Sequence, residues 1–195
     1  MEVLILGLVL FLGVHSTRIV ADGWRTRTIA RLGEKPWKGA YSAVSLIGLA
    51  LIVGGWALAR QHPTVLWSPP ATLKHLNSLF TLVAFVLVAA AYVPGNQIKA
   101  RLHHPMILGV KLWAFGHLLA TATLADVVLF GAFLVWAVFS FRAARQRDRA
   151  QGIVYPPGRL AGTLLAAVAG AVAWAVFAFW LHAAWIGVAP LGGAG

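Results

Sequence analysis

The chain has 195 residues, of which 60% are hydrophobic and only 11% are charged. Soluble domains carry about 25% charged residues, so this composition excludes an ordinary soluble domain. The formal net charge is +11, but the basic residues gather in short segments between apolar runs, so a nucleic-acid partner is not expected. Cysteine is absent, which excludes disulfides, thiolate metal ligands and cysteine nucleophiles.

Hydropathy predicts an all-α, polytopic integral membrane bundle of six transmembrane helices, forming a single domain over residues 1–195. The first apolar run is expected to be retained, because a glutamate precedes it where a signal peptide carries basic residues. Proline and glycine separate most of the later runs, as helix breakers do. In chain order, the predicted spans are Glu2–Ala21, Gly39–Ala59, Leu73–Val93, Pro105–Ala120, Leu124–Phe141 and Leu160–Val188.

The Lys and Arg residues distinguish the two sides of the membrane. The first, third and fifth connections are rich in them, whereas the second and fourth together hold only Arg60 and Lys74. Connections rich in Lys and Arg face the cytoplasm by the positive-inside rule. Six spans with this bias place both termini outside.

Two spacings along the chain predict local contacts. Thr123 and Asp126 have the spacing of a capping box, which favours capping over proton chemistry for Asp126. Gly162, Ala166 and Gly170 form a row of small residues that suits close helix packing, either within the chain or in a homo-oligomer.

Two of the seven histidines are predicted to lie deep in the membrane. At 1.5 Å per residue, His15 lies about 20 Å beyond Glu2, and His117 lies about 18 Å beyond Pro105 from the opposite face. Ionisable residues at such depth usually face the bundle interior and mark a site. The alternative is a neutral imidazole that bonds to a neighbouring helix. Five further histidines can reach water or headgroups: His62, His75, His103, His104 and His182.

A pair of buried imidazoles suits a haem better than a bare metal ion. A zinc site needs three or four protein ligands, and the acidic residues here are predicted near the membrane surfaces. A haem b needs only one or two axial ligands. Trp113, one turn before His117, would lie against the flat porphyrin ring. Ordinary packing within the helix bundle accounts for Trp113 equally well.

Two cations extend this candidate cofactor site. Lys111 lies about 9 Å inside its span and Arg18 lies near the inner end of the first span. Either would pair with a haem propionate. In the alternative interpretation, Lys111 extends back to the headgroups and Arg18 forms a local ion pair with Asp22, four residues on.

Three segments carry a resemblance to a known family. They are Gly13–Arg18 (GVHSTR), His104–Ala120 (HPMILGVKLWAFGHLLA) and Thr123–Gly131 (TLADVVLFG), and they resemble the NnrU family. That resemblance implies a multi-pass protein of the bacterial inner membrane, associated with denitrification and nitrogen-oxide metabolism.

The NnrU family is in turn similar to 15-cis-zeta-carotene isomerase, a membrane haem-b enzyme. Its implicated haem ligands match His15 and His117. The isomerase has a cysteine three residues before the second histidine, where this chain has Ala114. Any ligand exchange that uses that thiol is therefore impossible here, whereas haem binding is not affected.

Three functional hypotheses follow. The first is a haem-b membrane protein of nitrogen-oxide metabolism, with nitric oxide as the small ligand. The second is a haem-dependent cis–trans isomerase of a carotenoid-like polyene, which requires a cleft open to lipid between the spans. The third is a non-catalytic assembly or transport factor, in which the row of small residues is an oligomer contact.

Overall fold

The structure is a computed structural model that describes residues 1–190, and this part of the chain is helical without any strand. Within it, four helical segments are long and apolar enough to cross a membrane: α4 (Glu34–Ala59), α5 (Ala71–Tyr92), α8 (Leu124–Ala150) and the segment Leu160–Ile186. Two shorter apolar helices are α1 (Glu2–His15) and α7 (Pro105–Ala120). The all-α membrane class is therefore confirmed, and the count of six spans stays a prediction. The predicted outward position of the C-terminus concerns residues outside the described range.

The remaining elements are short or belong to the last long segment. They are α2 (Thr17–Val20), α3 (Asp22–Leu32), α6 (Gln97–Leu102), α9 (Leu160–Val176), the π-helical segment η1 (Phe177–Leu181) and α10 (His182–Ile186).

Large apolar side chains are exposed along the long helices, among them Leu46 and Val53 of α4, Leu79 of α5 and Val168 of α9. A continuous apolar surface of this kind is unfavourable in water, because soluble proteins rarely tolerate large apolar patches. The acyl chains of a bilayer impose no such penalty. The surface therefore agrees with the membrane class that composition predicts.

The first predicted span ends earlier than expected, at His15 instead of Ala21. The hydroxyl of Ser16 donates to the Leu12 carbonyl at 2.6 Å, and that of Thr17 donates to the Val14 carbonyl at 2.8 Å. Such bonds compete with the helical ladder and end or bend helices. A helix of 14 residues is about 21 Å long, shorter than a hydrocarbon core of about 30 Å.

The last predicted span also differs from the expectation, because it contains η1 and ends at Ile186 instead of Val188. Gly187 follows in the left-handed region with φ of 74°, the conformation in which helices commonly terminate. The Nδ1 of His182 donates to the Val188 carbonyl at 2.6 Å and holds the chain just beyond the helix end.

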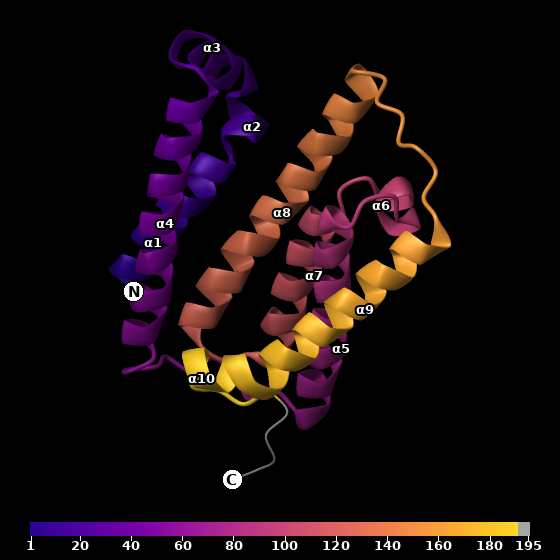
Figure 1. Ribbon diagram of the computed structural model, residues 1–195. Helices are drawn as coiled ribbons and strands as arrows, with labels where there is room; N and C mark the ends of the chain where they lie inside the picture. The colour runs from indigo at the N-terminus through magenta and orange to yellow at the C-terminus, as the bar shows by residue number, and fades with distance from the viewer. Residues whose placement is uncertain (191–195) are drawn as a thin grey trace. The chain divides into compact units, whose positions relative to one another are not determined.

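The chain forms two compact units. Unit 1 comprises residues 1–67 and 122–145, and in it α1 and α4 run side by side (Figure 1). Glycines allow this close approach. A Cβ built on Gly7 would lie 2.5 Å from the Ile52 nitrogen, and one on Gly48 would lie 2.8 Å from the Phe11 nitrogen. The helix backbones therefore touch directly, as small residues permit in membrane proteins.

The predicted capping box is present at the start of α8 in unit 1. The Asp126 carboxylate accepts from the Thr123 hydroxyl at 2.7 Å and from its backbone N–H at 3.4 Å. Its other oxygen accepts from the indole N–H of Trp56 at 2.9 Å, a partner 70 residues away. Asp126 therefore both caps α8 and joins it to α4.

We expect Asp126→Ala to lower the free energy of unfolding by about 2–3 kcal/mol, because the cap is lost and a partly buried indole N–H is left unpaired. Trp56→Phe should cost about 1 kcal/mol, since the cap survives. The measurement is the thermal unfolding midpoint in detergent. An Asp126→Ala protein that is as stable as wild type would contradict the structural role and favour proton chemistry.

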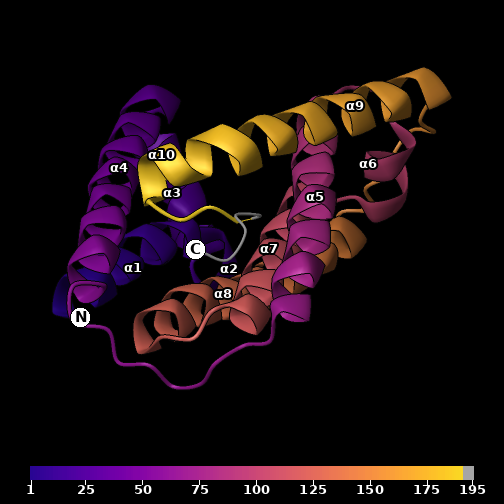
Figure 2. The same cartoon turned by 90° about the horizontal axis from the view of Figure 1, so that it is seen from below.

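Unit 2 comprises residues 68–121 and the chain from Gln146 onward. In it α5 packs against α7 and is crossed by α9 (Figure 2). The predicted small-residue row lies in this second contact: a Cβ on Gly170 would lie 2.7 Å from the Val86 nitrogen, and Ala166 is fully buried. The close helix packing is therefore intramolecular, and a homo-oligomer would need another surface.

Asn96 holds the connection between α5 and α6 in unit 2. Its side-chain NH₂ donates to the carbonyls of Ala90 at 2.8 Å and Val93 at 2.6 Å, and its oxygen accepts from the Lys99 backbone at 2.7 Å. Its neighbour Gly95 accepts from the Arg159 backbone N–H at 2.7 Å. This one amide therefore caps α6 and closes the end of α5.

Candidate functional site

His15 lies at the C-terminal end of α1 within a group of aromatic rings. Its ring stacks on Phe11 at 4.2 Å between centroids and lies 5.1 Å from Tyr41 and 6.1 Å from Trp136. Its Nδ1 is 2.6 Å from the Phe11 carbonyl oxygen. A carbonyl only accepts, so the proton is on Nδ1 and the Nε2 lone pair is the ligand or acceptor position.

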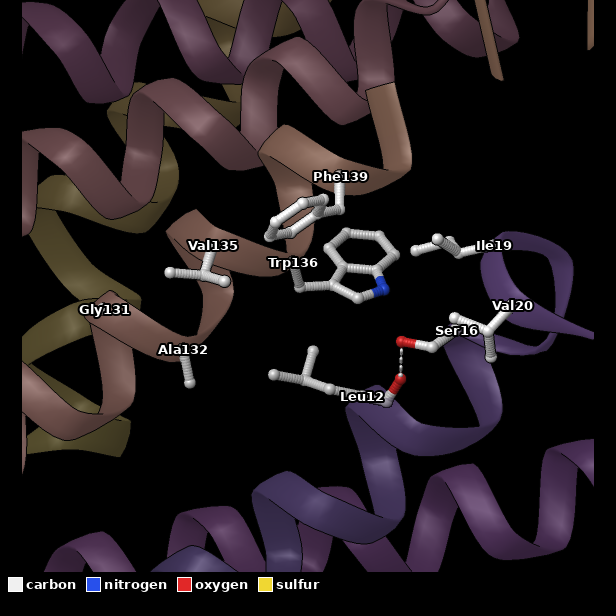
Figure 3. A pocket seen from close by; sticks show the side chains of 9 residues that line it. All are labelled: Leu12, Ser16, Ile19, Val20, Gly131, Ala132, Val135, Trp136 and Phe139. Carbon is white, nitrogen blue, oxygen red and sulfur yellow. Dashed lines mark hydrogen bonds between the residues drawn. The ribbon is translucent and has the colours of Figure 1, made fainter. Parts of the chain in front are cut away.

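An apolar cleft of about 610 Å³ lies in unit 1 (Figure 3), and Trp136, one of the rings around His15, lines it. The residues that line it come from α1, α2, the junction between them, and α8: Leu12, Ser16, Ile19, Val20, Gly131, Ala132, Val135, Trp136 and Phe139. Its volume is in the range of small-molecule sites. The buried Trp136 indole nitrogen makes no hydrogen bond to any described residue, and Figure 3 shows it turned toward Ser16 and Ile19.

His117 lies near the C-terminal end of α7 in unit 2. Its Nδ1 is 2.8 Å from the Trp113 carbonyl oxygen, and its ring centroid is 5.2 Å from that of Trp113. The same argument places the proton on Nδ1 and the lone pair on Nε2. Both predicted histidines therefore use the carbonyl four residues earlier to select one tautomer.

The two predicted cations differ in their surroundings. Arg18 lies 3.6 Å from Asp22, so the predicted local ion pair is confirmed, and Arg25 reaches the same carboxylate at 4.0 Å. Lys111 is exposed on α7. Of the predicted site residues, unit 1 thus holds His15 and Arg18, and unit 2 holds Lys111 with the Trp113–His117 pair.

Within residues 1–190, no group of three or more His, Cys, Asp or Glu side chains is placed to bind a metal ion. The imidazoles of His15 and His117 therefore suit a group that brings most of its own ligands. A porphyrin does so, and it needs from the protein an unprotonated imidazole nitrogen with an apolar, aromatic surround. The surroundings of His15 meet that requirement.

One cluster of ionisable residues was not predicted from the sequence. In unit 2, Asp148 accepts from His104 at 2.8 Å and from the Tyr155 hydroxyl at 3.1 Å, and His103 lies 3.8 Å away. His103 stacks on Tyr155 at 4.1 Å and has φ of 65°, a conformation that costs energy for a residue other than glycine.

The available signal for this cluster in the sequence was weak. Asp148 is the single acidic residue between Arg142 and Arg159, but its partner His104 is 44 positions away. The cluster joins the start of α7 to the end of α8. His103 and His104 were expected only to reach water or headgroups, and the structure gives both a carboxylate partner in Asp148.

Comparison with curated proteins and with solved structures gave no match. The sequence model of the NnrU protein family, in contrast, matches residues 3–190. The match includes the GVHSTR segment around His15 and the helix that carries His117. It covers nearly the whole chain, and this chain therefore belongs to the NnrU family.

Proposed function

We propose that this NnrU-family protein is an integral membrane haem-b protein in which His15 and His117 would hold the haem iron. The observation that carries the proposal is the shared tautomer: each Nδ1 donates to the carbonyl four residues earlier, at 2.6 Å and 2.8 Å. A hydrogen bond from Nδ1 to a carbonyl orients an imidazole and raises the basicity of its other nitrogen.

The protein residues would perform distinct tasks at such a site. Phe11, Tyr41 and Trp136 lie against the His15 ring and would give the site an apolar surround. Trp113 lies against the His117 ring. Arg18 and Lys111 would supply positive charge to carboxylates at the rim. Bound haem supplies redox chemistry and a binding position for small ligands such as nitric oxide.

The test is the absorption spectrum of protein purified from cells supplied with haem precursor. We expect a Soret band that disappears in a His15→Ala, His117→Ala double variant. Replacing His62 and His182 by alanine is the matched control, because neither is a predicted ligand, and it should keep the band. Wild-type protein without a Soret band would refute the proposal, as would a double variant with an unchanged band.

We propose nitrogen-oxide metabolism in the bacterial inner membrane as the biological role, on the basis of family membership. A deletion strain should consume nitric oxide more slowly during growth on nitrate, and the double variant should not restore the rate. If the variant restores it fully, the protein is instead a non-catalytic assembly or transport factor.

Reporter fusions at both ends would test the proposed outside termini.

The apolar cleft favours a second candidate function, cis–trans isomerisation of a carotenoid-like polyene. Its volume of about 610 Å³ and its apolar lining suit part of a long hydrocarbon. Membranes that contain the protein should convert an added cis-carotene, and membranes that lack it should not. Val135→Trp, which fills the cleft, should block conversion but leave the haem spectrum unchanged.

A further inference from the structure

The segment around α3 carries positive charge that the chain does not balance. Between residues 18 and 38 there are six Lys or Arg residues and two acidic ones. Asp22 pairs with arginines at 3.6 Å and 4.0 Å, and Glu34 pairs with Lys38 at 2.9 Å. Over the part of the chain that the structure describes, no acidic side chain lies within 4.0 Å of Arg27, Arg31 or Lys35.

Two of these cations share an exposed face of α3 with an aromatic ring. Trp24, Arg27 and Arg31 are spaced by three and four residues, so they lie along one side of the helix. Trp24 is 51% exposed and Leu32 is 61% exposed. Because such large apolar groups are costly in water, and Arg27 and Arg31 lie on the same helix, α3 suits an environment that is partly apolar and partly charged.

The position of α3 relative to α1 and α4 is consistent with the boundary between hydrocarbon and headgroups. It precedes the long apolar helix α4 and lies beyond the end of the α1–α4 pair at which α4 begins (Figure 1). Trp24 contacts Trp37 of α4 with ring centroids 5.6 Å apart, so the two helices are held together there. Tryptophan, lysine and arginine concentrate at this level of a membrane, where hydrocarbon gives way to headgroups.

We propose that α3 is an interfacial helix and that Arg27 and Arg31, assisted by Lys35, bind the headgroup of an anionic phospholipid. Trp24 and Leu32 insert among the upper acyl carbons, and the guanidinium groups reach the phosphate. Interfacial helices combine these two contributions, apolar burial and attraction to anionic lipid. The proposal goes beyond haem binding and does not depend on it.

The test compares lipid binding to the purified, delipidated full-length protein in neutral detergent. Phosphatidylglycerol and phosphatidylcholine with identical acyl chains are titrated, and bound lipid is counted by native mass spectrometry. Each basic residue near an anionic surface contributes about fivefold in affinity, so the Arg27→Gln, Arg31→Gln double variant should bind phosphatidylglycerol about 25-fold more weakly. Its binding of phosphatidylcholine should not change.

The matched control is a Lys74→Gln, Arg101→Gln double variant, which removes the same net charge from exposed positions outside α3. It should keep the preference for phosphatidylglycerol. An equal loss in both double variants would show a net-charge effect and overturn the proposal, as would equal binding of the two lipids by wild type. As an independent measurement, wild type should lose the preference between about 0.01 M and 1 M salt, because exposed charges are screened.

Discussion

Replacing Gly55 by alanine is expected to separate α1 from α4 and to unfold unit 1 at a much lower temperature than wild type. A Cβ at this position would overlap the backbone of Leu4, lying 2.7 Å from its Cα and 2.8 Å from the Val3 carbonyl carbon. The obstructing atoms are backbone, so no side-chain rotation relieves the clash. Overpacking costs about 1–3 kcal/mol when side chains can adjust, and we expect at least about 3 kcal/mol here.

Gly54 is the matched control, because it is the neighbouring residue of the same helix and a Cβ on it meets nothing within 4 Å. Gly54→Ala should stabilise α4 by about 0.5–1 kcal/mol, since alanine is the better helix former. The measurement is thermal unfolding of each variant in detergent, followed by tryptophan fluorescence. If the two alanine variants melt at the same temperature, the close packing of α1 on α4 is wrong.

Asn96→Asp is expected to destabilise unit 2 by about 3–5 kcal/mol, although the two side chains have the same shape. Asn96 is only 1% exposed, and its NH₂ group donates to two backbone carbonyls. Aspartate places an oxygen there, which leaves both carbonyls unpaired and sets a buried negative charge against them. The bond that Asn96 accepts from the Lys99 backbone survives the change.

The control for this prediction is Gln61→Glu, the same amide-to-acid change at an exposed site. It should leave the unfolding temperature within about 2 °C of wild type, because surface substitutions usually cost less than about 0.5 kcal/mol. Protease accessibility of the connection between α5 and α6 reports the local effect, and it should rise for Asn96→Asp alone. Equal stability of the Asn96→Asp and Gln61→Glu variants would contradict the structural role of Asn96.

Hydropathy located the four long and two shorter apolar helices of residues 1–190, because the cost of placing a residue in lipid depends on that residue and its close neighbours. The helix ends were less predictable. The first helix stops at His15 because two hydroxyl groups bond to carbonyls three and four residues earlier. Each of these bonds contributes about 1 kcal/mol or less. A hydropathy value averaged over many apolar residues does not detect so small a local effect.

In the candidate site, too, the sequence predicts the residues but not their detailed contacts. Depth along two apolar runs was enough to select His15 and His117, because an ionisable residue in hydrocarbon is costly wherever it occurs. The tautomer of each ring depends on where Nδ1 meets a backbone oxygen. The rotamer of each histidine side chain determines whether Nδ1 reaches that oxygen, and the order of residues alone does not specify the rotamer.

The sequence by itself determined the class of protein, the apolar helices, the capping box at Thr123 and Asp126, and the two candidate ligands. Each of these depends on composition or on spacings within a few turns of helix. The tertiary structure decided which groups meet across long separations: the indole of Trp56 with Asp126, 70 residues apart, and His104 with Asp148, 44 apart. Such partners are chosen by the packing of whole helices, and no local pattern records that packing.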